Sequence, residues 1–169
     1  MTNLFPDHYY NSAYEIPYED LFAAGKRAVI FDIDNTLVTH GAPADEKSAR
    51  LIKRLQAIGF KVCFLSNNRE ERVKSFNEKL GACYVYKAGK PKRSGYLKAM
   101  EMTMSDKNTA VFVGDQIYTD VYGARRTGIE TFLTKPIDKR EEFQIILKRI
   151  IEKPILLAYK IYLKIHKRR

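Results

Sequence analysis

The stretch VIFDIDNTLV, residues 29–38, places two carboxylates at the end of an apolar run. Its first residues are β-branched or aromatic, which is typical of a short buried strand. Asp32 and Asp34 follow two positions apart, so they lie on the same face of an extended chain. Paired carboxylates at a strand exit add little to stability. We therefore interpret them as candidate functional residues.

Further apolar runs alternate with amphipathic segments along the chain. The predicted strands are 27–33, 61–66, 83–86, 110–114 and 130–133. The predicted helices between them are at about 46–58, 69–80, 91–104 and 118–127. Near-continuous apolar strands separated by helices are typical of a parallel sheet covered on both faces. The pattern predicts an α/β fold, a Rossmann-like parallel sheet of about five strands flanked by helices.

The composition is that of one globular domain. The 169 residues are 45% hydrophobic and 30% charged, without a low-complexity tract. Cys63 and Cys83 fall in predicted strands without a CxxC spacing, so we expect reduced core thiols in a reducing compartment. The first 22 residues lack the basic start and apolar segment of a secretory signal. These features predict a cytoplasmic location.

Polar residues follow several of the predicted strands. Asp32 and Asp34 end the first, Ser66, Asn67 and Asn68 the second, and Asp115 the fourth, while the third leads to Lys90. Each residue alone is compatible with a turn, a helix cap or a solvated position. In an open α/β sheet, however, ligands bind at the carboxyl ends of the strands. The pattern therefore predicts a single site at this end of the sheet.

Four short motifs of the chain resemble those of a known family. DIDNT (32–36), Ser66–Asn67, Lys90–Pro91 and GDQIYTD (114–120) resemble, in order and spacing, the four motifs of the haloacid dehalogenase-like phosphatases. The resemblance covers about residues 27–135. It implies a phosphoric monoester hydrolase that works through an aspartyl-phosphate intermediate.

The resemblance also implies a role for each matched residue. Asp32 is expected to be the nucleophile, and Asp34 to protonate the leaving alkoxide and later to deprotonate water. Because a carboxylate and a phosphate dianion repel each other, a hard cation such as Mg²⁺ is expected between them. Its ligands would be the Asp32 carboxylate, the Asp34 backbone carbonyl and Asp115, with Asp120 in support. Ser66, Asn67 and Lys90 are expected to bind the phosphate.

The spacing of the motifs leaves no room for a cap domain. Many members of the superfamily insert such a domain between the first and second motifs or between the second and third. Here 32 residues separate Asp34 from Ser66, and 24 separate Ser66 from Lys90. One loop, a helix and a strand use up each interval. We expect the capless subclass III, with an open site that favours a large or membrane-borne phosphate ester.

The C-terminal region carries most of the net charge of +10. From Lys139 onward there are ten Lys or Arg and three Glu, a net charge of +7. A helix is predicted at 141–152 with a core-facing stripe, which consists of Phe143, Ile146, Leu147, Ile150 and Ile151. Pro154 is expected to end it. A separate basic amphipathic helix is then predicted for residues 155–169.

The basic C-terminal helix is expected to lie on a surface rather than to span a bilayer. About 14 helical residues reach only ~21 Å, short of the ~30 Å hydrocarbon core. Lys160, Lys164 and Lys167 share a narrow arc, which favours peripheral contact with an anionic membrane. The aromatic-rich N-terminal arm is a candidate to join this contact. Packing of both segments on the domain, or on a second subunit, is the alternative.

We predict an N-terminal arm (1–26), a haloacid dehalogenase-like hydrolase domain (27–152) and a basic C-terminal helix (153–169). Within the superfamily the chain most resembles the YqeG-type phosphatases, which are related to phosphatidylglycerophosphate phosphatases. That resemblance implies phospholipid biosynthesis, a phospholipid head-group substrate and a peripheral membrane location. Alternatives left open are nucleic-acid ends, phosphoproteins, or a small phosphate ester covered by oligomerisation. A non-catalytic binding or scaffold protein is the alternative from another class.

Overall fold

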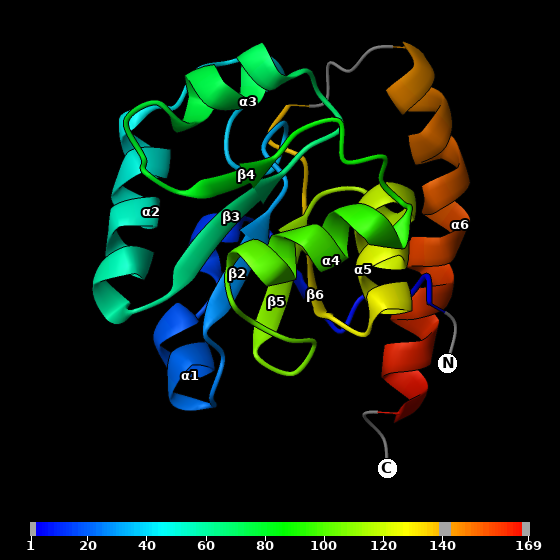
Figure 1. Ribbon diagram of the computed structural model, residues 1–169. Coiled ribbons are helices and arrows are strands. Elements are labelled where there is room, and N and C mark those ends of the chain that lie inside the picture. The colour runs from blue at the N-terminus through cyan, green and yellow to red at the C-terminus, as the bar shows by residue number, and fades with distance from the viewer. Residues whose placement is uncertain (1–2, 139–142, 167–169) are drawn as a thin grey trace.

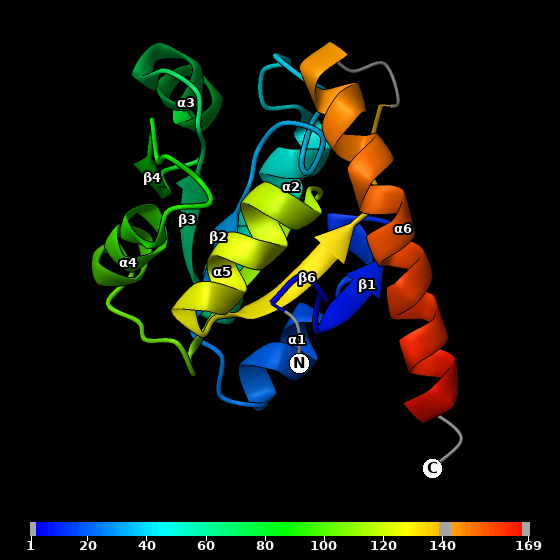
Figure 2. The same ribbon diagram turned by 90° about the vertical axis from the view of Figure 1, so that its right-hand side faces the viewer.

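The computed structural model describes the backbone of residues 3–138 and 143–166, with the side chains of 3–138 and 152–165. Within these described residues six strands form one sheet, and every neighbouring pair is parallel. The strands are β1 (His8–Tyr10), β2 (Ala28–Phe31), β3 (Lys61–Leu65), β4 (Cys83–Val85), β5 (Ala110–Gly114) and β6 (Glu130–Thr134). Their order is β1-β6-β5-β2-β3-β4, and Figure 1 shows β2 to β6 while Figure 2 shows β1 beside β6. The α/β class is confirmed, with one strand more than the expected five.

Helices cover both faces of the sheet (Figure 1). The four predicted helices correspond to α2 (Glu46–Ile58), α3 (Glu70–Asn77), α4 (Arg93–Met102) and α5 (Tyr122–Thr127), and a short helix, α1 (Tyr18–Ala23), precedes β2. Because side chains alternate along a strand, Val29 and Phe31 pack with α1, α2 and α3, whereas Ala28 and Ile30 pack with α4 and α5. The central strand β2 is therefore buried on both faces, as its continuous apolar run predicts.

Part of the segment 1–26 is built into the sheet and the core. β1 pairs with β6, with His8 opposite Phe132. The His8 ring also approaches the Glu130 carboxylate, with 2.7 Å between Nε2 and Oε1. Tyr18 is fully buried, and its hydroxyl donates to the Ala13 carbonyl at 2.8 Å. These contacts attach the beginning of the chain to the edge of the sheet.

The C-terminal helix α6 (Phe143–His166) is continuous through Pro154. The expected break at Pro154 is wrong, and so is the expected short length of the last helix. Pro154 is exposed, and a proline on the solvent side of a helix is tolerated because water can bond to the carbonyl that loses its N–H partner. The expected stripe from Phe143 to Ile151 lies outside the described side chains, as does Lys167. Among the described residues, no helix is both long and apolar enough to cross a membrane.

The intervals between the motifs contain only elements of the main fold. Residues 35–45 form a loop that leads into α2 and β3, and α3 and β4 occupy the interval from Ser66 to Lys90. Neither interval, each of which lies wholly within 3–138, contains a separate domain. The carboxyl ends of β2 and β5 are therefore not covered by an inserted domain.

Cys63 and Cys83 lie opposite each other in β3 and β4 as free thiols, the first buried and the second half-buried.

Candidate active site

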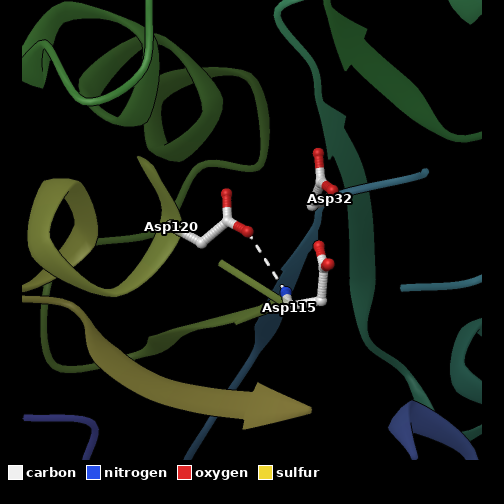
Figure 3. A group of neighbouring side chains, drawn as sticks. All are labelled: Asp32, Asp115 and Asp120. Atoms are coloured by element: carbon white, nitrogen blue, oxygen red, sulfur yellow. Dashed lines mark hydrogen bonds between the residues drawn. The ribbon is translucent and has the colours of Figure 1, made fainter. Parts of the chain in front are cut away.

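Three carboxylates meet at the carboxyl end of the sheet. Asp32 follows β2 and Asp115 follows β5, and these two strands are neighbours. Asp120 comes from a π-helical turn, η2 (Ile117–Val121), just beyond Asp115. Each carboxylate offers one oxygen within 4.8 Å of the others, and all three side chains are buried (Figure 3). Parallel topology thus brings together acidic groups that are up to 88 residues apart.

Lys90 brings a positive charge into this acidic cluster. Its Nζ donates to Asp32 Oδ1 at 2.6 Å and to Asp120 Oδ1 at 2.8 Å. Burial alone would lower the pKa of Lys90, but Asp120 and Asp32 outweigh burial and hold the pKa above its ordinary value. Lys90 therefore stays an ammonium group, and it ties the nucleophile candidate to the acidic turn.

Asp32 carries the clearest electrostatic signature of the site. Burial raises its pKa to about 7, Lys90 opposes this rise, and the Asp120 carboxylate adds to it. One ammonium group does not neutralise three buried carboxylates, so a further cation would stabilise their ionised forms. A donor set made only of oxygens suits a hard divalent cation such as Mg²⁺. The residues present therefore fit the expected metal.

The backbone and a threonine orient the acidic groups. Asp120 Oδ2 accepts from the amides of Asp115 and Gln116 at 3.1 and 3.0 Å. Figure 3 shows the first of these bonds, with the Asp120 side chain reaching back toward the Asp115 amide. Thr36 Oγ1 donates to Asp115 Oδ1 at 3.3 Å. Asp120 thus bonds to Lys90 and to the backbone, which suits a supporting position beside Asp32 and Asp115.

Asp34 lies at the rim of the cluster with its carboxylate held from three sides. It accepts from the Gly41 amide at 2.8 Å, from Asn68 Nδ2 at 2.6 Å and from Arg72 Nη2 at 2.9 Å. Sequence reasoning noted Asn68 only as a polar residue at a strand exit. It missed Arg72, because one arginine on a charged helix carries no distinguishing pattern.

Ser66 and Asn67 both reach the site, but their side chains are engaged differently. The Ser66 hydroxyl is buried and accepts from the Asn68 amide at 3.2 Å. The Asn67 side chain clamps the Lys90 backbone, accepting from its N–H at 2.7 Å and donating to its carbonyl at 3.2 Å. In this arrangement Asn67 positions Lys90, and its expected contact with phosphate stays a prediction.

A cavity of about 150 Å³ opens among these groups. It is lined by the predicted Asp32, Asp34, Ser66, Asn67 and Lys90, and also by Asn35, His40, Asn68, Gln116 and Thr119. Pockets that enclose whole small molecules usually measure ~300–1,000 Å³. This cavity therefore suits the phosphoryl end of a substrate whose remainder stays outside.

A local glycine and a distant glutamate support the turn that carries Asp120. A Cβ at Gly114 would lie 2.5 Å from Asp120 Oδ2, so only glycine lets this carboxylate reach its amide partners. The buried Glu152 of α6 accepts from the amides of Ile117 and Tyr118 at 2.7 and 3.4 Å. The C-terminal helix thus helps to hold the turn, which the sequence did not predict.

Comparisons with known proteins agree with this geometry. The family model of the haloacid dehalogenase-like hydrolases matches residues 40–128, more than half of the chain. The "Probable phosphatase YqeG" of Bacillus subtilis (strain 168) is 35% identical over 156 residues, which cover 92% of this chain and 91% of that protein. Together with the site, this relation supports a phosphoric monoester hydrolase.

Solved structures share the fold at low identity. An uncharacterized protein from Listeria monocytogenes serotype 4b has a TM-score of 0.55 at 20% identity, covering 69% of this chain and 85% of that one. A putative HAD superfamily (subfamily III A) hydrolase from Legionella pneumophila has a TM-score of 0.55 at 18% identity, covering 72% of each chain. The family model and the curated relative together show that this chain belongs to the haloacid dehalogenase-like hydrolases.

Proposed function

We propose that the protein is a Mg²⁺-dependent phosphomonoesterase that acts through a phosphorylated Asp32. The observation that carries this proposal is the buried contact of Lys90 with Asp32 and Asp120 beside Asp115. Phosphoryl transfer needs a nucleophile and positive charge near the phosphoryl oxygens. A carboxylate, an ammonium group and a set of oxygen ligands for a metal ion lie next to the small cavity and meet these needs.

The reaction begins with attack of an Asp32 carboxylate oxygen on phosphorus. The bond between phosphorus and the ester oxygen breaks, and Asp34, in its protonated form, gives its proton to the leaving alkoxide. Asp34, now a carboxylate, then takes a proton from water. The resulting hydroxide attacks the phosphorus of phospho-Asp32, which releases inorganic phosphate and regenerates the Asp32 carboxylate. The cycle consumes one water molecule and leaves the protein unchanged.

Other groups of the cavity act through charge and position. Lys90 stabilises the negative charge that builds up on the phosphoryl oxygens, and the Ser66 hydroxyl is placed to donate to the same oxygens. Asp32, the Asp34 backbone carbonyl and Asp115 would hold the metal ion, with Asp120 in support. When bound, Mg²⁺ supplies the positive charge that lets the Asp32 carboxylate approach a phosphate dianion.

We further propose that the substrate is a phospholipid head-group phosphate such as phosphatidylglycerophosphate, and that the chain is a member of the capless subclass. The small cavity supports a substrate of which only the phosphoryl end enters. The absence of an inserted domain within the described intervals supports an open site that accepts a bulky or membrane-borne ester. On this proposal the protein acts at the membrane surface in phospholipid biosynthesis.

The mechanism is tested first on a soluble aryl phosphate. We expect phosphate release that requires Mg²⁺, stops with EDTA and is abolished in Asp32→Asn. The control is Asp106→Asn, which changes an exposed residue on another surface and should leave turnover unchanged. Turnover that survives EDTA or the Asp32→Asn change would refute the mechanism.

The substrate is tested separately with a panel of phosphate esters. It contains phosphatidylglycerophosphate in mixed micelles, glycerol phosphate, a phosphopeptide and oligonucleotides with terminal phosphates. We expect the lipid to have the highest kcat/KM by at least about tenfold, because interactions of the lipid remainder outside the cavity would add binding energy that the smaller esters lack. Preference for any of the water-soluble esters would reject the lipid substrate but leave the mechanism intact.

A further inference from the structure

The C-terminal helix α6 has one face that packs on the domain. Tyr159 is buried, and the Phe5 ring centroid lies 5.5 Å from its ring and 5.6 Å from that of Tyr162. Ile155 and Leu156 pack against an apolar cluster from η2 and β6. Figure 2 shows the helix beside β1 and β6. These contacts fix the rotation of α6 about its axis, so its opposite face is turned to solvent.

The opposite face, which we term the outer face of α6, combines aliphatic and cationic side chains. It consists of Lys153, Leu157, Lys160, Ile161, Lys164 and Ile165, and all six are exposed. Leu157, Ile161 and Ile165 are 61%, 50% and 60% exposed. Because they are four residues apart, they form one stripe along consecutive turns, and at 3.6 residues per turn the lysines fall along one edge of it.

Charge on the outer face is of one sign. Among the described side chains 152–165, the single acidic residue is Glu152, which is buried against η2. A second copy docking through this face would bring two rows of lysines together without an acidic partner from the described helix. Nucleic acid offers phosphates but nothing for the aliphatic stripe. An anionic bilayer offers both, since phosphate head groups adjoin acyl chains there.

We infer that the outer face of α6 is a docking surface for an anionic lipid bilayer. The helix lies flat in the interface, with its three aliphatic side chains at the acyl boundary and its three ammonium groups among the head-group phosphates. This inference names the surface on which the substrate would reside, so in that respect it rests on the proposed function. Binding itself requires no turnover and is measurable without it.

Docking in this way places the membrane against the helix that supports the candidate site. The inner side of the same helix holds the turn at Ile117 and Tyr118 through Glu152, and the adjacent Gln116 and Thr119 line the cavity. A bilayer against the outer face is therefore separated from this turn by about one helix diameter, ~10 Å.

Co-sedimentation of the full chain with vesicles tests the inference. Vesicles of phosphatidylcholine alone are compared with vesicles of phosphatidylcholine and phosphatidylglycerol in equal amounts, at low and high salt. One variant carries Leu157→Ser, Ile161→Ser and Ile165→Ser, and another carries Lys153→Gln, Lys160→Gln and Lys164→Gln. Matched controls change exposed residues elsewhere, Leu97→Ser with Met102→Ser on α4, and Lys53→Gln, Lys74→Gln and Lys98→Gln on α2, α3 and α4.

We expect wild type to bind the anionic vesicles at least tenfold more tightly than the neutral ones, and to lose binding at high salt. The aliphatic variant should bind anionic vesicles at least tenfold more weakly than wild type. In the lysine variant, each of the three changes should weaken this binding about fivefold. The controls should stay within twofold of wild type. Unchanged circular dichroism and aryl phosphate turnover establish that the variants are folded.

Three results would overturn the inference. The first is equal binding of wild type to neutral and anionic vesicles, and the second is an equal loss in the matched controls. The third is a dimer in analytical ultracentrifugation that the aliphatic variant dissociates, which would assign the face to a second copy. If wild type binds anionic vesicles but hydrolyses no phosphate ester, the docking surface stands and the proposed function fails.

Discussion

Arg72 Nη2 lies 2.9 Å from Asp34 Oδ1, with both side chains largely buried. The ion pair connects α3 to the carboxylate at the rim of the cavity, and Asn68 holds the other oxygen of that carboxylate. A guanidinium group is planar and always charged, so it fixes the orientation of a carboxylate better than a lysine does. Arg72 is therefore a positioning residue for the candidate acid and base of the site.

Arg72→Ala is expected to lower kcat/KM, which reports the transfer of the phosphoryl group to Asp32, about tenfold or more for alkyl phosphates and to change it little for aryl phosphates. The reason is that an alkoxide leaving group needs protonation by Asp34, whereas an aryl oxide leaves without it. Steady-state kinetics with both ester types measure the difference. Arg72→Lys should recover part of the alkyl activity, and the exposed Lys74→Ala on the same helix is the control. An equal loss for both ester types would indicate a merely structural role.

Lys90→Met is expected to destabilise the metal-free protein by about 3–5 kcal/mol. The change leaves the buried Asp32 and Asp120 carboxylates without their cation, and an unpaired buried charge is costly. Denaturant unfolding in EDTA measures the free energy of unfolding. The neighbouring exposed Lys92→Met should change it by less than about 0.5 kcal/mol. Similar values for the two variants would contradict the assigned ion pairs.

Glu152→Ala is expected to lower the free energy of unfolding by about 1–3 kcal/mol, because it removes the acceptor of the buried Ile117 amide and of the partly buried Tyr118 amide. Turnover should fall as well, since the turn carries Asp120. Glu152→Gln keeps an acceptor oxygen and should be milder in both measurements. The exposed Glu101→Ala serves as a control for the loss of a carboxylate. If Glu152→Ala unfolds with the same curve as wild type, α6 does not hold the turn.

Glu130 should make stability depend on pH. Burial alone would raise the pKa of Glu130, but hydrogen bonds from Lys26 and His8 outweigh it and hold the pKa below the ordinary value of 4.5. The ionised form therefore stabilises the fold above pH 4.5, and this contribution is lost as the pH falls through the lowered pKa. Glu130→Gln should lower the free energy of unfolding by about 0.5–1 kcal/mol at neutral pH, with the difference vanishing in acid.

Chemical denaturation over a pH series checks this dependence. The matched control is Glu46→Gln, whose carboxylate pairs with Arg50 in an exposed contact on α2. That change should have little effect at any pH. A Glu130→Gln difference that stays constant from neutral to acidic pH would contradict the prediction.

The central part of the fold was predictable because its signals are local. Continuous apolar runs such as 110–114 specify buried parallel strands, and parallel strands place their exits at one end of the sheet. The sequence alone therefore assigns Asp32 and Asp115 to one site. β1 was missed, because three residues, His8–Tyr10, are too few to show a period and their pairing depends on β6.

Short-range periodicity and motifs are enough to specify the α/β class, the strand exits and the residue types that gather there. Which distant side chains hold those residues in place depends on the folded arrangement. Arg72 on α3 and Glu152 on α6 have no local pattern that marks them, because their partners are selected by packing between elements. The continuity of α6 through Pro154 was decided in the same way. The packed inner face of α6 also decided which of its apolar residues remain at the surface.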